Sequence, residues 1–260
     1  MKIFHEIAPL RAHLSARPRA QRGFVPTMGA LHAGHRALLE RARAENGEVA
    51  LSIYVNRPQF NDAGDFTNYP VTLDADLEMA RAAGVDVVFA PPPEALYPDA
   101  YRYRVTETTY ARTQEGAHRP GHFDGVLTVV LKLFQLIDPG RAYFGEKDWQ
   151  QLRLVEGMAE ALFLPVEIVR CPTVRAEDGL ALSSRNARLS PEDRKRAAAF
   201  PAAMARAAST EAAVEALRKD GFTVEYVLDD GDRRLGAVVL GGVRLIDNLP
   251  LPSFPSPSAT

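Results

Sequence analysis

Two histidines and two glycines gather in one short stretch, Pro26-Thr27-Met28-Gly29-Ala30-Leu31-His32-Ala33-Gly34-His35, between an apolar run and an amphipathic segment. A helix that begins here presents unpaired N–H donors and the positive end of its dipole, and the glycines let the backbone approach a ligand closely. His32 and His35 lie three residues apart, so on an opening helical turn both could donate to one nucleotide phosphate. The stretch therefore predicts a phosphate site, which we favour over a pair of unrelated surface histidines. A metal site is the remaining alternative, because the spacing suits two ligands, although no third ligand in helical register accompanies them.

A second charged group follows another short apolar run, in Gly145-Glu146-Lys147-Asp148. The segment from Gly140 to Lys147 is not a P-loop, because Glu146 precedes the lysine and Asp148 stands where a magnesium-binding hydroxyl is required. The chain also has no Gly-x-Gly-x-x-Gly after a strand, which argues against a dinucleotide-dependent dehydrogenase. Open α/β sheets bind ligands where strands end, so we expect Lys147 to meet a phosphate and Asp148 to accept from ribose hydroxyls. A solvated charge cluster without a function is the alternative.

Further polar candidates lie on predicted loops. Leu182-Ser183-Ser184-Arg185-Asn186 combines two hydroxyls with a planar guanidinium, which suits a triphosphate or pyrophosphate. Gln59 and Gln151 come just after predicted strand ends and could bind a small polar substrate, donating to a carboxylate and accepting from hydroxyls. Taken alone, the first is better explained as an ordinary polar linker and the two glutamines as surface amides.

The elements that must position these residues follow an alternating pattern. From residue 20 onward, short β-rich runs alternate with amphipathic segments, which is typical of βαβ units around a mainly parallel sheet and predicts an α/β fold. The runs at 23–25, 49–55, 85–90, 141–144 and 166–169 predict strands, and helical spacing predicts helices over 34–45, 72–83, 126–137 and 148–162. Residues 101–105 alternate like a strand as well and predict a cover for one edge of the sheet.

The composition changes after Pro172, where Arg, Asp and Ala become frequent, so we place a domain boundary near residue 173. This gives one domain over 1–173 and a smaller α+β domain over 174–260. In the second, Ser190-Pro191-Glu192-Asp193 predicts a helix start, 210–219 a further helix, and 223–228, 237–240 and 243–246 three strands. From about residue 250, prolines interleaved with serines predict a disordered tail.

Charge and cysteine content exclude several classes of protein. The 31 Lys and Arg against 33 Asp and Glu give a net charge of −2, so we expect no nucleic-acid partner and no binding to an anionic membrane. One cysteine, Cys171, forms no intrachain disulfide and supplies no Cys-rich zinc site. The first twenty residues carry charges throughout, unlike a signal peptide, and no apolar stretch approaches the roughly 20 residues that span a bilayer. We therefore expect a soluble, cytoplasmic protein.

Three of these motifs together carry a resemblance to a known family. They are Pro-Thr-Met-Gly-Ala-Leu-His-x-Gly-His at 26–35, Tyr-Phe-Gly-Glu-Lys-Asp-x-Gln-Gln-Leu at 143–152 and Ser-Ser-Arg-Asn at 183–186. In this order the chain closely resembles the pantothenate synthetase family, also called pantoate-β-alanine ligases, of the His-x-Gly-His nucleotidyltransferase superfamily. Arg119-Pro120-Gly121-His122-Phe123 and Arg244-Leu245-Ile246-Asp247-Asn248-Leu249 agree too, and the match covers most of residues 20–190.

The resemblance implies a Rossmann-like domain that binds ATP and pantoate, a smaller C-terminal domain acting partly as a lid, a homodimer, and ATP with Mg²⁺ as a substrate. Carried over position by position, it implies nucleotide binding by Met28, Gly29, Ala30, Leu31, His32, Ala33, Gly34, His35, Gly145, Glu146, Lys147, Asp148, Val174, Leu182, Ser183, Ser184 and Arg185. Among these, His35, His32 and Lys147 are expected to be catalytic, with His35 as the proton donor. Gln59 is expected to contact pantoate and β-alanine, and Gln151 to contact pantoate.

The activity that the resemblance implies is the ATP-dependent condensation of (R)-pantoate with β-alanine. It yields pantothenate, AMP and pyrophosphate through a pantoyl-adenylate intermediate. Two alternatives stay open. Another nucleotidyltransferase of the superfamily would act on a phosphate, although the neutral Gln59 and Gln151 argue against this. A non-catalytic nucleotide-binding regulator would bind ATP without turnover.

Overall fold

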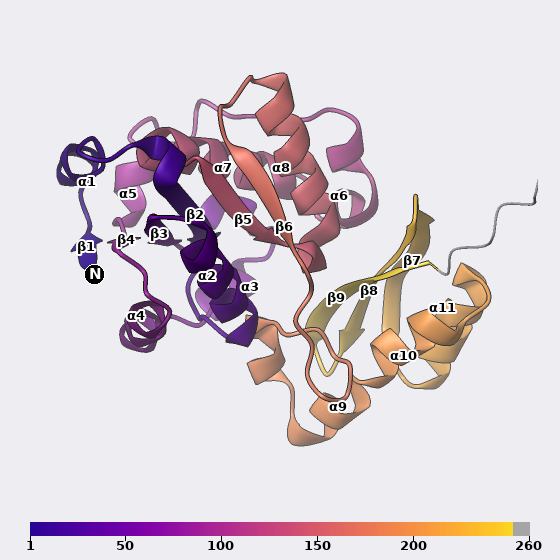
Figure 1. Cartoon of the computed structure of the whole chain (residues 1–260). Helices are drawn as coiled ribbons and strands as arrows, with labels where there is room; N and C mark the ends of the chain where they lie inside the picture. The colour runs from indigo at the N-terminus through magenta and orange to yellow at the C-terminus, as the bar shows by residue number, and fades with distance from the viewer. Residues whose placement is uncertain (252–260) are drawn as a thin grey trace, which may run out of the picture. The chain divides into compact units, whose positions relative to one another are not determined.

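A parallel sheet forms the centre of the N-terminal part of the chain. In the computed structural model, which describes residues 1–251, the chain divides into two units, Met1–Thr173 and Val174–Thr260. Residues 1–173, all of them described, form a six-stranded parallel sheet in the order β1-β4-β3-β2-β5-β6 (Figure 1). Its strands are β1 (Lys2–Phe4), β2 (Arg22–Thr27), β3 (Glu48–Ile53), β4 (Val87–Phe89), β5 (Arg141–Gly145) and β6 (Glu167–Cys171).

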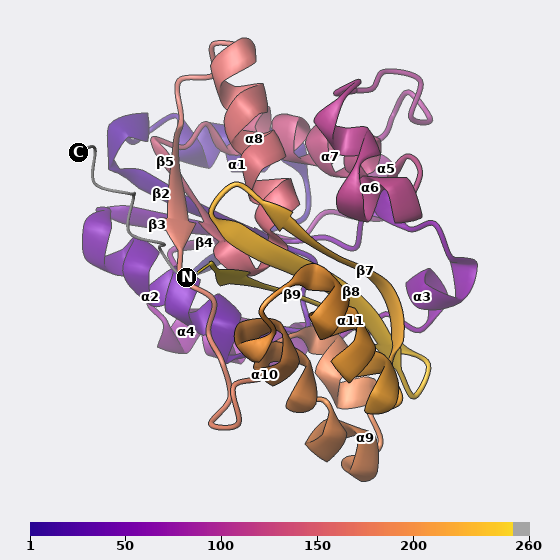
Figure 2. The same ribbon diagram turned by 90° about the vertical axis from the view of Figure 1, so that its right-hand side faces the viewer.

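Helices cover both faces of this sheet, and so its central strands are apolar on both sides (Figures 1 and 2). One face packs on α2 and α4 through a core that includes Val25, Leu39 and Ala80. On the other face Phe134 of α7 meets Phe24 and Phe144 with ring centroids 6.4 and 6.3 Å apart, and α1 and α8 pack beside α7. The helices of this unit are α1 (Ile7–Leu14), α2 (Ala33–Glu45), α3 (Ala63–Thr67), α4 (Leu73–Ala82), α5 (Pro93–Leu96), α6 (Gln114–His118), α7 (His122–Ile137) and α8 (Trp149–Ala161).

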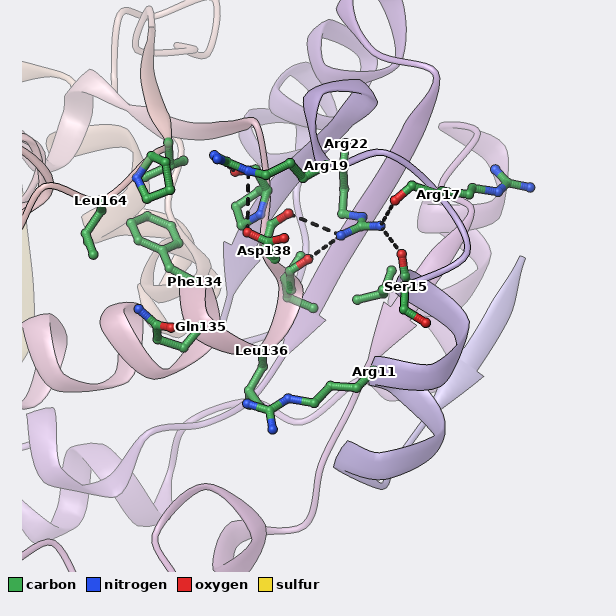
Figure 3. A pocket seen from close by; sticks show the side chains of 15 residues that line it. Arg11, Ser15, Arg17, Arg19, Arg22, Phe134, Gln135, Leu136, Asp138 and Leu164 are labelled. Carbon is green, nitrogen blue, oxygen red and sulfur yellow. Dashed lines mark hydrogen bonds and ion pairs between the residues drawn. The ribbon is translucent and has the colours of Figure 1, made fainter.

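A buried arginine anchors the start of β2. Arg22 is 2% exposed, and its Nε donates to Glu48 Oε2 at 2.8 Å. Its two remaining nitrogens donate to four backbone carbonyls at 2.6–3.3 Å (Figure 3). Two of these carbonyls lie at the end of α7, one at the end of α1, and one three residues after α1. One side chain thus ties β2, β3, α1 and α7 together at the amino ends of the strands.

The second unit has a small antiparallel sheet. Its described residues form β7 (Thr223–Asp230), β8 (Arg233–Leu240) and β9 (Val243–Pro250) in that order. Phe200, Met204 and Leu217 bury one face of the sheet, and they come from α10 (Ala199–Arg206) and α11 (Thr210–Lys219). The short α9 (Pro191–Arg196) begins at Ser190, whose hydroxyl accepts from the N–H of Asp193 at 3.0 Å.

The structure confirms the predicted mainly parallel α/β fold with a smaller α+β part, and it corrects one expected strand. Residues 101–105 form no strand, because Tyr101 has a left-handed backbone with φ 63° and Tyr103 is 76% exposed. The segment is held against α7 instead, where the N–H of Val105 donates to Thr128 Oγ1 at 2.9 Å. Strand β1 and helices α1 and α10 were not expected from the sequence. The predicted disordered tail falls almost wholly on 252–260, outside the described residues.

Candidate active site

Successive strands are added to the sheet on one side of β2 and then on the other. The polar residues lie where β2 and its neighbours end. From β2 the chain proceeds to β3 and β4 on one side, whereas β5 and β6 lie on the other. The carboxyl ends of strands at such a reversal border the crevice in which open α/β sheets bind ligands. Three loops leave the sheet there, after β2 at residues 28–32, after β3 at 54–59 and after β5 at 146–148.

The loop after β2 is held by a buried carboxylate from α4. Asp76, 2% exposed, accepts from the N–H groups of Ala30 at 2.9 Å and Leu31 at 2.8 Å, and from the Thr72 hydroxyl at 3.1 Å. These bonds stabilise two consecutive left-handed residues, Gly29 with φ 83° and Ala30 with φ 49°. A Cβ at position 29 would lie 2.9 Å from Asp76 Oδ2, so the clamp requires glycine there.

The two histidines cap helix α2 and stack against each other, with ring centroids 4.2 Å apart. The Nδ1 of His32 accepts from the N–H of Gly34 at 3.1 Å, and the Nδ1 of His35 accepts from the N–H of His32 at 3.3 Å. Since a neutral imidazole that accepts at Nδ1 carries its proton on Nε2, both rings are Nε2–H donors. The helix therefore offers a ligand two ring N–H groups in place of the backbone donors that the rings have occupied.

Both histidines are neutral at physiological pH. The pKa of His35 is lowered to about 3, mainly by burial, with contributions from His32 and Lys147. The pKa of His32 is lowered to about 4, mainly by burial, with a contribution from Lys147 that Asp148 opposes. Strands β2 and β5 are parallel neighbours, so the loops that follow them leave the sheet side by side. The influence of Lys147 on both histidines agrees with this arrangement, which brings His32, His35, Lys147 and Asp148 to one region. Gly145 and Glu146 belong to the same turn, which is a single turn of 3-10 helix over Glu146–Asp148.

The loop after β3 brings Gln59 to Met28. The Nε2 of Gln59 donates to Met28 Sδ at 3.2 Å, and Gln59 is 9% exposed. Its backbone carbonyl accepts from His122 Nδ1 at 2.7 Å and from Arg119 Nη2 at 3.2 Å. Helix α7 approaches the loop so closely that a Cβ on Gly125 would lie 2.7 Å from the backbone nitrogen of Gln59. The position of Gln59 is thus fixed from two sides.

The two adjacent glutamines at the start of α8 have different environments. Gln150 is buried, and its Nε2 donates to the carbonyls of Tyr110 at 2.7 Å and Thr113 at 3.0 Å, so it supports the fold. Gln151 lies half-buried in the first turn, three residues after Asp148. Its place in the chain is compatible with the expected role, and a contact with the substrate stays a prediction.

The remaining candidates belong to the second unit. The N–H of Leu182 donates to the carbonyl of Val174 at 3.0 Å, which brings these two residues together across a narrow turn. Ser183 caps the following turn of 3-10 helix, Ser184–Arg188, by accepting from the N–H of Arg185 at 3.2 Å. Asp247 of β9 holds the base of this segment through Arg175, with two bonds of 2.6 and 2.9 Å. The nucleotide contacts expected of Val174 and Leu182–Arg185 stay predictions.

A protein-built metal site is not present in the part of the chain that the structure describes. Within residues 1–251, no group of three or more His, Cys, Asp and Glu side chains could hold a metal ion. The same residues contain no helix long and apolar enough to cross a membrane.

Several residues that shape the site were not assigned a role by sequence reasoning. Asp76 lies on a predicted helix, but its contact with Ala30 joins residues 46 positions apart, which periodicity does not reveal. His122 is part of a motif that carries the family resemblance, and this was the one signal for it. Asn56 precedes Gln59 by three residues, and its buried amide could have been suspected only from that spacing.

The sequence matches one family along nearly its whole length. The model of the pantoate-β-alanine ligase family matches residues 2–250. The chain is 56% identical to the pantothenate synthetase of Bdellovibrio bacteriovorus over 227 residues, which are 87% of this chain and 90% of that protein. It is 47% identical to the pantothenate synthetase of Legionella pneumophila strain Lens over 249 residues, covering 95% of this chain and 99% of that protein.

Solved structures agree with this match. The crystal structure of pantothenate synthetase from Thermus thermophilus superposes with a TM-score of 0.89 at 46% identity, over 96% of this chain and 99% of that one. The structure of pantoate-β-alanine ligase from Francisella tularensis, complexed with β-γ ATP and β-alanine, superposes with a TM-score of 0.92 at 38% identity. That superposition covers 96% of this chain and 97% of the other.

Proposed function

This chain belongs to the pantoate-β-alanine ligase family, and from that premise we infer that the loops after β2, β3 and β5 form the site where ATP, pantoate and β-alanine react. The enzyme is a ligase that forms the amide bond of pantothenate, with AMP and pyrophosphate as the other products. One observation carries the site assignment. The Nε2–H groups of His32 and His35 lie beside Lys147, at the point where the strand order of the sheet changes direction.

The first half-reaction activates the carboxylate. An amine does not displace oxide from a carboxylate, so a pantoate oxygen attacks the α-phosphorus of ATP, and the bond to pyrophosphate breaks. Negative charge develops on the α-phosphate and on the departing pyrophosphate. His32, His35 and Lys147 stabilise this charge, because donors fixed in advance cost no reorganisation during the reaction. A bound triphosphate raises the pKa of both histidines, which suits the expected role of His35 as a proton donor.

The second half-reaction forms the amide. The neutral amine of β-alanine attacks the acyl carbon of pantoyl adenylate, AMP departs with the bonding electron pair, and the amine loses a proton. Water must be excluded, since the mixed anhydride would otherwise hydrolyse. We assign this exclusion to the second unit acting partly as a lid, with Val174 at the adenine and Leu182, Ser183, Ser184 and Arg185 closing over the triphosphate.

Mg²⁺ enters with ATP as part of the substrate. Mg²⁺ is commonly held by substrate phosphates with one or two carboxylates and several waters, so the lack of a three-ligand cluster among residues 1–251 is compatible with this arrangement. Asp148 is then available for ribose, beside Gly145 and Glu146 in the same turn.

Pantoate is held by amides and not by cations. Gln59, which also contacts β-alanine, and Gln151 are neutral, and this favours a carboxylate with hydroxyls over a phosphate as the acceptor substrate. A homodimer and a cytoplasmic location complete the proposal; light scattering of the purified protein measures the first.

A pyrophosphate-release assay tests the function. With ATP and pantoate but no β-alanine, we expect about one equivalent of pyrophosphate per site, and with β-alanine we expect continuous release together with pantothenate. Omission of pantoate should abolish both signals. ATP binding without any pyrophosphate release would contradict the proposal and indicate a nucleotide-binding regulator. Release that requires a phosphate-bearing acceptor would indicate a different nucleotidyltransferase; no observation on this chain favours either.

A further inference from the structure

A buried chain of hydrogen bonds lies behind Gln59. Asn56 is 1% exposed, and its amide makes three contacts. The hydroxyl of Tyr97 donates to Asn56 Oδ1 at 2.6 Å. The Nδ2 of Asn56 donates to Gln59 Oε1 at 2.9 Å and to the backbone carbonyl of Gly125 at 3.1 Å.

These contacts permit one orientation of both amides. A carbonyl only accepts, so the Gly125 carbonyl must face the nitrogen of the Asn56 amide. The oxygen of Asn56 then faces Tyr97, whose hydroxyl must donate to it. The Asn56 nitrogen also faces Gln59, which must therefore offer its oxygen. The Gln59 nitrogen points the other way, toward the weak acceptor Met28 Sδ at 3.2 Å.

We propose that Tyr97 is a positioning residue which, through Asn56, fixes the Gln59 amide as a hydrogen-bond donor toward the substrate. The proposal rests on the function inferred above and narrows it. The sequence suggested that Gln59 both donates to a carboxylate and accepts from a hydroxyl. In the structure its oxygen faces Asn56 and accepts from it, and its nitrogen lies on the opposite side of the amide. Gln59 therefore presents its N–H₂ group to acceptor oxygens of the substrate.

The Tyr97 hydroxyl is held in place by the surroundings of its ring. The ammonium of Lys132 lies 4.7 Å from the ring centroid and is itself fixed by the Leu96 carbonyl at 2.8 Å. The rings of Tyr54 and Tyr101 lie 6.5 and 5.5 Å away. Burial raises the pKa of Tyr97 well above its usual range, so the hydroxyl stays protonated and remains a donor.

Tyr97→Phe removes only this hydroxyl, and Tyr54→Phe is a matched control. Tyr54 is buried beside Tyr97, but its hydroxyl donates to the Pro93 carbonyl at 3.1 Å and does not reach Asn56. Losing one partner of a buried amide costs affinity by roughly tenfold, so we expect Tyr97→Phe to raise the pantoate KM and Kd about tenfold. The Kd for ATP should change less than about twofold, and Tyr54→Phe should alter neither constant by more than that.

Calorimetric titration of each ligand separately, with thermal unfolding of both variants, distinguishes the possible outcomes. If Tyr97→Phe weakens ATP and pantoate equally, or if it matches Tyr54→Phe, the positioning role is overturned. If the wild-type protein releases no pyrophosphate with pantoate, the proposed function fails instead, and the two failures are thus distinguishable. Both variants are titrated at a temperature below the melting temperature of the less stable one. The affinities for pantoate and ATP therefore remain measurable even if a substitution lowers stability.

Gln59→Glu tests the donor polarity itself. Glutamate has nearly the same shape and keeps an oxygen facing Asn56, but it replaces the outward N–H₂ with a second oxygen. We expect pantoate binding to fall by about 100-fold or more, because two carboxylates would face each other, while ATP binding is nearly retained. Pantoate binding within about threefold of wild type would show that Gln59 does not act as a donor and would overturn the proposal.

Discussion

Strand β2 begins and ends beside side chains that can carry positive charge, and the two ends use them in opposite ways. At its start, the five N–H groups of Arg22 make five bonds, to Glu48 and to the carbonyls of Leu14, Arg17, Ile137 and Asp138. At its end, His32 and His35 use one ring nitrogen each within the loop, and the chain's described residues supply no acceptor for the Nε2–H groups.

The difference separates a stabilising cluster from a binding site. A donor whose bonds are all made within the protein contributes to folding and has nothing left for a ligand. A donor that is positioned but not consumed keeps its hydrogen bond for the substrate, and the loop must then be held by other groups, which is what Asp76 does.

Charge composition alone would have identified the wrong end. A hollow of about 540 Å³ at the start of the sheet is lined by Arg11, Arg17, Arg19 and Arg22 (Figure 3). However, Arg17 Nη1 lies 3.6 Å from Glu48 Oε1, and Arg19 Nε lies 3.4 Å from Asp138 Oδ1. All five N–H groups of Arg22 are used in hydrogen bonds within the protein. Three of these four guanidinium groups therefore already lie beside a carboxylate of the protein, Glu48 or Asp138.

The largest effect should come from removing Arg22 at the start of β2. Arg22→Met leaves Glu48 and four carbonyls buried without their donor, so we expect a loss of about 3–5 kcal/mol in the free energy of unfolding. Urea denaturation measures this loss. The variant's turnover per folded molecule should remain near that of wild type, because Arg22 contacts no substrate.

Arg11→Met is the matched control for Arg22→Met. Arg11 lines the same hollow but is exposed, so its replacement should change stability by less than about 0.5 kcal/mol. Equal effects of the two substitutions would contradict the view that bond saturation, and not position in the hollow, determines the contribution.

The next largest effect should come from removing either histidine at the end of β2. His35→Ala and His32→Ala each remove a donor aimed at the phosphates, so adenylate formation should fall by roughly 10²–10³. The variants should stay folded, with a loss of about 0.5–2 kcal/mol in the free energy of unfolding, because each ring also caps α2. Single-turnover pyrophosphate release measures the rate. His13→Ala, whose ring stacks on Phe4, serves as a control that should leave the rate unaltered. Near-normal release in either site variant would show that the histidines are not catalytic.

A smaller effect is expected at Lys147. Removing a charged hydrogen-bond donor costs about 1.5–3 kcal/mol, so Lys147→Ala should slow the first half-reaction by roughly 10- to 100-fold. Lys147→Arg should restore little of this, because a planar fork does not replace a compact ammonium. Rates of single-turnover adenylation decide the point, and full activity of the alanine variant would remove Lys147 from the mechanism.

Stability should also depend on pH. The folded pKa values of His32, about 4, and His35, about 3, lie below the 6.5 of an unfolded histidine. Between pH 6.5 and about 3 the unfolded chain therefore binds more protons, so the histidine contribution to stability is complete above pH 6.5 and decreases as the pH falls toward 3. Urea titrations at several pH values should show this decrease, and the double variant His32→Gln, His35→Gln should reduce it. Ring NMR signals of His32 and His35 that titrate near pH 6.5 would contradict the prediction.

The sequence predicted the sheet well because burial on both faces leaves continuous apolar strands. The helices were predicted where their apolar positions recur every three or four residues, as in α2 and α4. Strand β1 escaped notice because it is largely exposed and begins with a lysine, whereas the equally short β4 lies in a continuous apolar run. The alternation at 101–105 was misleading, since alternating residues form a strand only where a neighbouring strand is present to pair with them.

The site was predictable as far as its geometry is local. The histidine pair follows from spacing at a helix start, so its common orientation could be expected. The contacts that hold it in place could not, because they join distant positions: Tyr97 and Asn56 are 41 residues apart, and His122 and Gln59 are 63 apart. Hydrogen-bond polarity, such as the occupied oxygen of Gln59, depends on such contacts and becomes visible only in the folded chain.

The carboxylate of Asp76 also determines whether the histidine loop keeps its conformation when it is transferred to another protein. Residues 26–35 grafted into another parallel sheet would carry both histidines but not the acceptor that keeps Gly29 and Ala30 left-handed, and Ala30 would then relax to relieve roughly 1–2 kcal/mol of strain. A functional graft must import β2, the loop and the start of α2 together with residues 72–76, which supply Thr72 and Asp76. The unit that evolution or an engineer can move is therefore two discontinuous segments of chain and not one motif.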